Sequence, residues 1–266
     1  MYKLVAIDLD DTLLNDDRQI TEATKQALAA AVEHGAVITL ATGRMYASAK
    51  AVARELELNV PLITYQGALV KNALDGKVLY ERSVPEHVAL QILEYCLAHG
   101  LHLQGYVEDQ LYVREDNEKT LAYTQLSKIP YIVEPDFTKI IRKPQAKMLI
   151  IDEPQKLDKV ADEFKSMFGD SAHITKSKPN FLEIMHPEGT KGSALRFLAE
   201  HFGCAIEDTI AIGDSWNDHD MIETAGLGVA MGNAVEPLKA VANYITSSNN
   251  EDGVKQVIDR FILESV

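Results

Sequence analysis

Three carboxylates follow an apolar run near the start of the chain, where residues 4–14 read LVAIDLDDTLL. Asp8, Asp10 and Asp11 stand where the pattern predicts the end of a buried strand, and Leu13 and Leu14 return to apolar character. Like charges this close repel one another, and burying them unpaired costs several kcal/mol. A bound divalent cation is the first candidate to offset that cost.

A second group of oxygen ligands lies in GDSWND, residues 213–218, after the apolar run TIAI. It adds the carboxylates of Asp214 and Asp218 and the carboxamide of Asn217. Hard oxygen ligands of this type suit Mg²⁺, which keeps some of its waters and bridges to phosphate oxygens. Together, the two acidic stretches predict a magnesium site that serves a phosphoryl group.

Two shorter stretches carry groups that suit the phosphate itself. Thr42-Gly43-Arg44 follows the apolar run VITLA, at the predicted start of a helix, where a hydroxyl and backbone amides form an anion site. Lys191, in EGTKGSAL, begins another predicted helix. A cation there opposes the helix dipole, and such violations of local preference often mark function.

The elements that must position these residues alternate between strands and helices at both ends of the chain. This rhythm predicts an α/β fold, with a Rossmann-like doubly wound parallel sheet and helices on both faces. Ligands bind at the carboxyl ends of such strands, so the four stretches are expected to meet. The predicted strands are 3–8, 36–41, 61–65, 208–214 and 226–232. The predicted helices are 21–34, about 45–57, 190–203 and about 251–264, with a loop plus helix over 215–226.

The middle of the chain has a different pattern, which predicts an α+β unit inserted into the core. Paired strands are expected around Glu108-Asp109, and a hairpin around residues 178–180. We therefore predict a catalytic core of residues 1–84 and 188–266, and an inserted α+β domain of residues 85–187. Predicted helices at 85–99, about 116–128 and 154–168, and a strand at 146–152, complete the insert.

Composition excludes several classes of protein. The 266 residues are 46% hydrophobic, which supports a folded core, and the formal net charge of −14 argues against nucleic-acid or anionic-membrane surfaces. Cys96 and Cys204 form no CxxC pair, so neither a zinc site nor an oxidising compartment is indicated. Without a signal-peptide pattern or a long apolar run, the expected location is the cytoplasm. The oligomeric state stays open.

Taken together, DLDDTLL, ATGR, the lysine of TKGSAL and GDSWND resemble, in order, the four motifs of the haloacid dehalogenase-like phosphohydrolases. The stretch FLEIMHPEGTKGSAL is most similar to the Cof-like sugar phosphatases, and the insert resembles their large α+β (C2-type) cap, the substrate-specificity domain. The resemblance implies a Mg²⁺-dependent phosphatase for small phosphorylated metabolites, such as sugar phosphates. Gln66 departs from the Asn of many relatives, and Trp216 occupies a variable position of the fourth motif.

The resemblance also implies roles for individual residues. Asp8 would be the nucleophile that forms an aspartyl-phosphate, and Asp10 the general acid and base. Mg²⁺ would be held by Asp8, Asp214 and the main-chain carbonyl of Asp10, with Asp218 supporting these ligands. The groups implied for binding the phosphoryl oxygens are Thr42, Lys191, Asn217 and the backbone amides of Leu9 and Gly43.

Two other functions stay open at this level. A phosphomutase or phosphotransferase would use the same aspartyl-phosphate, and would isomerise a sugar phosphate instead of releasing phosphate. A regulatory protein that accepts a phosphoryl group without turnover also needs an Asp cluster, a Thr and a Lys. Receiver-type domains of that kind, however, carry the acceptor Asp in mid-chain and have no insert.

Overall fold

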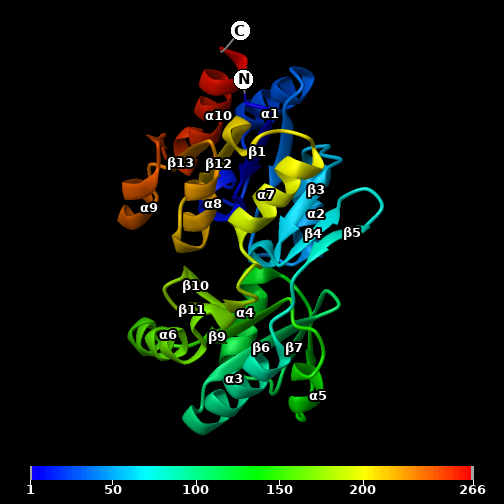
Figure 1. The fold of residues 1–266 in the computed structure, drawn as a ribbon, viewed down its shortest axis with the longest axis vertical. Helices are drawn as coiled ribbons and strands as arrows, with labels where there is room; N and C mark the ends of the chain where they lie inside the picture. The colour runs from blue at the N-terminus through cyan, green and yellow to red at the C-terminus, as the bar shows by residue number, and fades with distance from the viewer. Residues whose placement is uncertain (1, 265–266) are drawn as a thin grey trace. The chain divides into compact units, whose positions relative to one another are not determined.

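The computed structural model describes residues 2–264, which form two compact units (Figure 1). The core unit contains the residues up to Tyr80 and those from Thr190 onward. The inserted unit is Glu81–Gly189. The chain thus leaves the core once and returns once, and the role of the inserted unit as a substrate-specificity domain stays a prediction.

The core unit is built on a parallel sheet with the strand order β14-β13-β12-β1-β2. The four residues of β1 have no exposed surface, because helices cover both faces of the sheet and the strand needs an unbroken apolar run. The predicted doubly wound α/β fold is therefore confirmed. The strands are β1 (Leu4–Ile7), β2 (Val37–Leu40), β12 (Thr209–Gly213), β13 (Leu227–Ala230) and β14 (Tyr244–Ile245).

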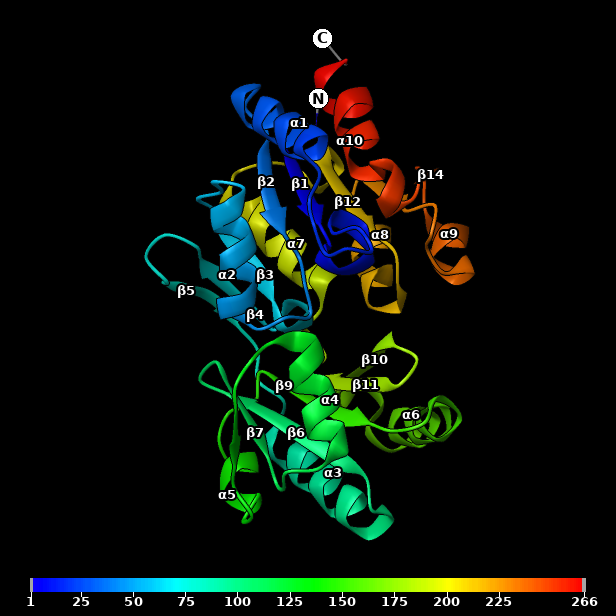
Figure 2. The ribbon, with the colours of Figure 1, turned by 180° about the vertical axis from the view of Figure 1, so that it is seen from behind.

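Helices pack on the two faces of this sheet in pairs. Helix α1 packs against α10 on the face turned to the viewer in Figure 2, and α7 packs against α8 on the other face. Thr21 caps α1 as predicted, because its side-chain oxygen accepts a hydrogen bond from the Thr24 amide. The helices are α1 (Glu22–Glu33), α2 (Tyr46–Glu55), α7 (Lys191–His201), α8 (His219–Thr224), α9 (Glu236–Val241) and α10 (Gly253–Ile258).

A smaller three-stranded sheet, β3-β4-β5, extends the core unit. Strand β3 (Pro61–Thr64) continues the parallel arrangement through a bridge between Ala41 and Ile63, and β4 (Leu69–Asn72) runs antiparallel to it. The pattern predicted β3 but neither β4 nor β5 (Val78–Glu81). Strand β4 has two buried and two partly buried residues, and β5 has none that is buried, so neither has the fully buried apolar run of the central strands.

The inserted unit has a sheet of six strands in the order β10-β11-β9-β6-β7-β8. Both predicted hairpins are present, since β6 pairs antiparallel with β7, and β10 with β11. The tight turn between β6 and β7 places Glu108 and Asp109 at positive φ. The strands are β6 (His102–Val107), β7 (Gln110–Val113), β8 (Tyr131–Val133), β9 (Lys147–Ile151), β10 (His173–Lys178) and β11 (Phe181–Met185); β8 was not predicted.

One face of this sheet forms the apolar core of the inserted unit. Leu103, Met148 and Leu182 point from three strands into a cluster with α3 (Glu86–His99), α5 (Thr138–Ile141) and α6 (Pro154–Phe168). The alternate residues carry polar groups. Lys147 and Glu183 form a buried ion pair of 2.8 Å, and Tyr106 donates to the hydroxyl of Tyr123 on α4 (Glu118–Ser127).

His102 gives the inserted unit a predicted pH dependence. Burial, followed by the charge of Lys119, lowers the pKa of His102 to about 4, so the folded protein keeps this ring neutral. The unfolded chain protonates the same ring below about pH 6.5, so stability falls as the pH drops from about 6.5 towards 4. At pH 5 this costs wild type roughly 2 kcal/mol of unfolding free energy.

Urea unfolding at pH 7.5 and pH 5.0 tests the effect. His102→Gln is expected to lose less stability than wild type between the two pH values, whereas His99→Gln, at an exposed ring, should follow wild type. Equal losses in all three proteins would assign the pH dependence to other groups.

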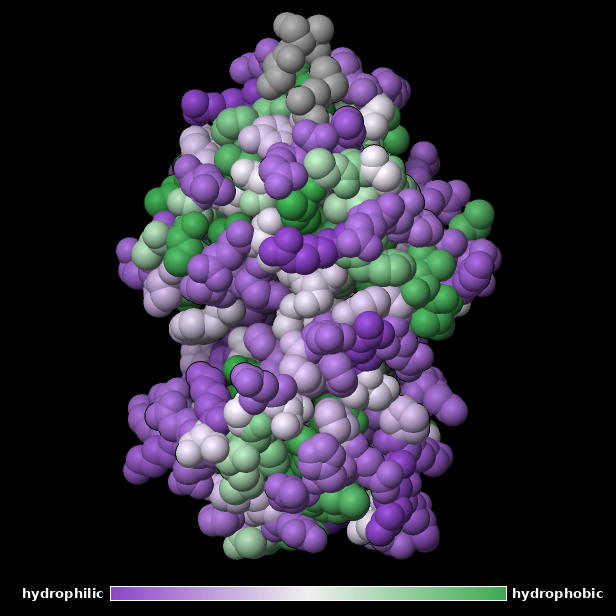
Figure 3. All heavy atoms as spheres, viewed as in Figure 1, coloured by the Kyte–Doolittle hydropathy of each residue, from purple (hydrophilic) through white to green (hydrophobic). Residues whose placement is uncertain are grey.

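Hydrophilic residues predominate on the face drawn in Figure 3, and hydrophobic residues form small separate groups there. Within residues 2–264, each helix is too short or too polar to cross a bilayer.

Candidate active site

Asp8 stands immediately beyond β1, at the carboxyl edge of the parallel sheet. Its amide continues the ladder by donating to the Ile212 carbonyl at 3.0 Å, and its side chain is almost fully buried. The chain then enters a tight turn, Leu9–Leu13, in which Asp11 has a φ of 60°. The spacing of Asp8 and Asp10 predicts that their side chains share one face of the strand. Strand β1 ends at Ile7, however, and Asp10 lies in the turn, so the two side chains do not share a strand face.

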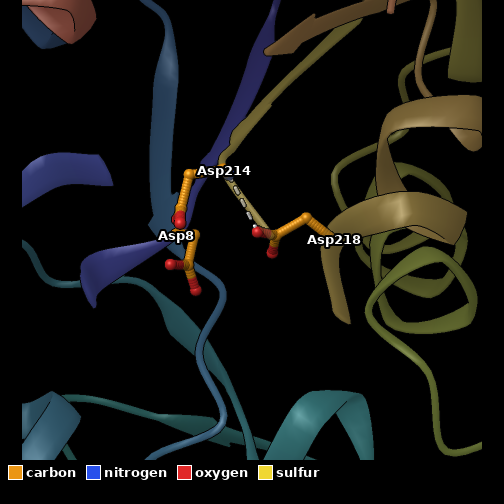
Figure 4. Close-up of side chains that lie close together, drawn as sticks. All are labelled: Asp8, Asp214 and Asp218. Atoms are coloured by element: carbon orange, nitrogen blue, oxygen red, sulfur yellow. Dashed lines mark hydrogen bonds between the residues drawn. The ribbon is translucent and has the colours of Figure 1, made fainter. Parts of the chain in front are cut away.

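Three carboxylates from separate parts of the core unit converge at this edge. Asp8 follows β1, Asp214 follows β12, and Asp218 ends the short helical turn Trp216–Asp218 (Figure 4). One oxygen of each lies within 4.8 Å of the others. The structure thus brings together both acidic stretches, as the topology predicted.

Lys191 lies between two of these carboxylates. Its Nζ is 2.5 Å from an oxygen of Asp8 and 2.5 Å from an oxygen of Asp218, and its side chain is fully buried. Burial alone would lower the pKa of Lys191, but the charges of Asp218 and Asp8 outweigh burial and raise it. Lys191 is the first residue of α7, so these two carboxylates explain how a cation is tolerated at a helix N-terminus.

Backbone and hydroxyl groups fix the two carboxylates of the fourth motif. Asp218 Oδ2 accepts from the amides of Asp214 and Ser215, both at 3.0 Å, which closes the loop on itself. A Cβ on Gly213 would overlap the Asp218 side chain, so this position requires glycine. Thr12, in the first motif, donates to Asp214 at 2.8 Å and links the two acidic stretches directly.

The charges of this cluster do not balance. Burial raises the pKa of Asp8 well above its usual range, although Lys191 opposes the shift. Burial, and then the charge of Asp218, raise the pKa of Asp214 to about 7. With all three carboxyls ionised, three negative charges would face one ammonium group, and two of them would be uncompensated. A divalent cation with oxygen preference fits both that charge and the donor set.

Asp10 lies outside the cluster and is paired with Arg44. The guanidinium forks onto both carboxylate oxygens, with Nε at 2.9 Å and the terminal nitrogen at 2.6 Å. Such a bidentate pair fixes the orientation of the carboxylate. The sequence did not predict a role for Arg44. Its position next to Thr42 and Gly43 was the one signal that could have indicated this contact.

Thr42 is buried, and its hydroxyl accepts a hydrogen bond from the Arg44 amide at 3.1 Å. Helix α2 begins at Tyr46, so Thr42 and Gly43 lie in the loop before the helix and not in its first turn. The anion site predicted here would therefore consist of loop amides. The roles predicted for the Leu9 and Gly43 amides stay predictions.

The remaining residues of the fourth motif differ in exposure. Asn217 donates from Nδ2 to Gln66 Oε1 at 3.0 Å, which places it beside the segment Tyr65–Gly67 that follows β3. Trp216 is 41% exposed, unlike the buried carboxylates around it. Its sequence position leaves two interpretations open, stacking on a sugar ring or packing under the predicted cap.

Comparisons with known proteins agree with this geometry. Residues 5–258 match the family of haloacid dehalogenase-like hydrolases. YxeH of Bacillus subtilis, provisionally named a phosphatase, is 35% identical over 272 residues, which cover 99% of each chain. A solved structure from Thermotoga maritima is 36% identical, covers 98% of each chain and has a TM-score of 0.84.

A further solved structure, titled as a HAD subclass IIB sugar phosphatase, is 26% identical with a TM-score of 0.86. It covers 97% of this chain, and this chain covers 98% of it. The order of the motifs, the fold and the relatives agree. The chain belongs to the haloacid dehalogenase-like hydrolases, in their Cof-like group, and it is a phosphatase.

Proposed function

We propose that this phosphatase hydrolyses phosphate monoesters of small metabolites, with sugar phosphates as the leading class, through an aspartyl-phosphate on Asp8 and with Mg²⁺ as cofactor. The observation that supports this proposal most strongly is the buried triad of Asp8, Asp214 and Asp218 with Lys191 between two of its members. A purely structural cluster would not need three carboxylates for one lysine.

The residues divide into those that would hold the metal and those that would bind phosphate. Asp8, Asp214 and the main-chain carbonyl of Asp10 would hold Mg²⁺, which when bound would neutralise charge on the phosphoryl oxygens. Asp218 is already engaged by two backbone amides and Lys191, so its role would be to support these ligands. The phosphoryl oxygens would be bound by Thr42, Lys191, Asn217 and the amides of Leu9 and Gly43.

The proposed reaction has two displacements at phosphorus. Asp8 attacks in line, its oxygen–phosphorus bond forms, and the ester bond breaks as Asp10 protonates the leaving alkoxide. Asp10 then takes a proton from water, which attacks the same phosphorus and releases phosphate from Asp8. The fork from Arg44 suits the second step, in which Asp10 is ionised, and must loosen when Asp10 carries its proton.

Two observations support small substrates. One relative of solved structure is titled as a sugar phosphatase, and the inserted unit of this chain folds as a separate α+β body like the cap that the family uses for selectivity. We therefore propose that residues 81–189 determine which sugar phosphates the protein hydrolyses.

Phosphate release from a panel of phosphorylated sugars, nucleotides and cofactors tests the proposal, with Mg²⁺ and with a chelator. We expect strong release from a few sugar phosphates and at least a tenfold loss on chelation, as for other metal-assisted phosphoryl transfers. Mg²⁺ should also raise the melting temperature of wild type but not of Asp214→Asn. Full activity in chelator would contradict the metal assignment, and isomerised sugar phosphate without free phosphate would indicate a mutase.

A further inference from the structure

The segment Tyr65–Gly67 has an unusual backbone. Its three residues have φ values of 52°, 61° and 102°, in the left-handed region that costs non-glycine residues about 1 kcal/mol or more each. Such a conformation persists only where the surroundings hold it in place.

Contacts to two of the four motifs hold this segment. The Tyr65 amide donates to the Arg44 carbonyl and the Gln66 amide to the Thr42 carbonyl, both at 3.0 Å. These bonds lie on either side of Gly43, whose Cβ, if present, would overlap the Gln66 carboxamide. On the other side, a Cβ on Gly67 would overlap the Thr190 carbonyl, directly before Lys191.

The Gln66 side chain also contacts the fourth motif, residues 213–218. It is 1% exposed, and its Oε1 accepts the Asn217 Nδ2 hydrogen bond of 3.0 Å. Asn217 Oδ1, in contrast, is buried without a hydrogen-bond partner within the described part of the chain. A buried carboxamide oxygen without a hydrogen-bond partner is rare. At a functional site it indicates that a ligand, or a water bound with it, donates the missing hydrogen bond.

We propose that Gln66 is a positioning residue, which holds the Asn217 carboxamide in the orientation that binds the transferring phosphoryl group. The Asn217 amide has two hydrogens, of which one is donated to Gln66 and the other is left to donate to a phosphoryl oxygen. The unpaired Oδ1 only accepts, so it is left for a bound water or a hydroxyl of the ligand. This inference rests on the proposed function of Asn217 as a phosphoryl-binding group.

The length of the side chain matters to this role. An asparagine at this position would be one methylene shorter, so its carboxamide would lie farther from Asn217 Nδ2 on the same backbone. Because the phosphoryl group is common to all substrates, Gln66 should affect every ester to a similar extent. A residue that selects the leaving group would instead change the KM of some esters and spare others.

A double-mutant cycle between Gln66 and Asn217 tests the proposal. Gln66→Met keeps the shape and length of the side chain but removes the hydrogen bond, and Asn217→Ala removes its partner. We expect each single variant to lower kcat/KM about tenfold for all esters, through kcat more than KM, and the double variant to be no worse than Asn217→Ala. Gln66→Gly, which suits the left-handed backbone, serves if Gln66→Met does not fold.

The outcomes separate this proposal from the one on which it rests. Additive losses of kcat/KM, or wild-type rates in both Gln66 variants, would overturn the positioning role. The proposed phosphatase mechanism would still stand in that case, provided that wild type releases phosphate. If wild type released no phosphate from any ester, the mechanism would fail. The same cycle on the affinity for inorganic phosphate, measured by titration calorimetry, would then decide the Gln66 role by the same criterion of non-additivity.

Discussion

Asp8→Asn is expected to abolish phosphate release, by a factor on the order of 10⁴ or more, and to leave the protein folded. The carboxamide is almost the same size as the carboxylate but does not attack phosphorus. Asp8 also belongs to a buried cluster with more negative charge than Lys191 compensates, so losing one charge should not lower the melting temperature without metal. The measurements are phosphate release in Mg²⁺ and a thermal melt in chelator.

The matched control is Asp11→Asn, the same chemical change three residues away on an exposed side chain. Asp11 has a φ of 60°, a conformation that asparagine tolerates well, so this variant should fold and turn over like wild type. Residual activity in Asp8→Asn of more than a trace would reject Asp8 as nucleophile. A large drop in its melting temperature would mean that Asp8 serves mainly to hold Lys191.

The sequence predicts the approach of Asp8 and Asp214 because both residues follow strands of one parallel sheet. Strands β1 and β12 are neighbours and run parallel, so both end at the same edge of the sheet. Asp8 and Asp214 directly follow these ends and therefore lie close together. Lys191 was recognisable because a cation at a helix start needs a reason. Asp218 was recognisable from the density of carboxylates in its motif.

Other features depend on long-range contacts that no local pattern encodes. The Arg44 fork onto Asp10 joins residues of different loops. The role proposed for Gln66 depends on a left-handed backbone, which the sequence does not indicate because glutamine rarely adopts it. The early end of β1 has a similar cause. The turn at Leu9–Leu13 breaks the alternation that would place Asp8 and Asp10 on one face.

The fold shows the same division. Central strands such as β1 and β12 are continuous apolar runs and were predicted, because a sheet covered on both faces leaves no room for polar side chains. Short edge elements such as β8 and β14 were not. They bury little surface and are held by pairing with a neighbour, which the local sequence does not reveal.

Lys191→Met should impair both catalysis and stability. Without the ammonium group, Asp8 and Asp218 lose their shared partner at 2.5 Å, and three carboxylates stay buried together. Removing one partner of a buried ion pair costs about 3–5 kcal/mol, equivalent to roughly 10 °C in melting temperature for a chain of this size. Because Lys191 is proposed to bind the phosphoryl group, its loss should also lower kcat/KM by about 10²–10³-fold.

The effect of Mg²⁺ on the melting temperature distinguishes the loss of a charge from this cluster from a general loss of core packing. A divalent cation should replace part of the missing positive charge, so the increase in melting temperature with Mg²⁺ should be larger in Lys191→Met than in wild type. Lys147→Met, which breaks the buried pair with Glu183 in the inserted unit, is the matched control and should lose stability without a larger Mg²⁺ response. Adding Asp218→Asn to Lys191→Met should recover stability but not turnover, because the charge is rebalanced while the phosphate ligand stays missing. Equal Mg²⁺ responses in wild type and both lysine variants would show that Lys191 and the metal do not share the charge of this cluster.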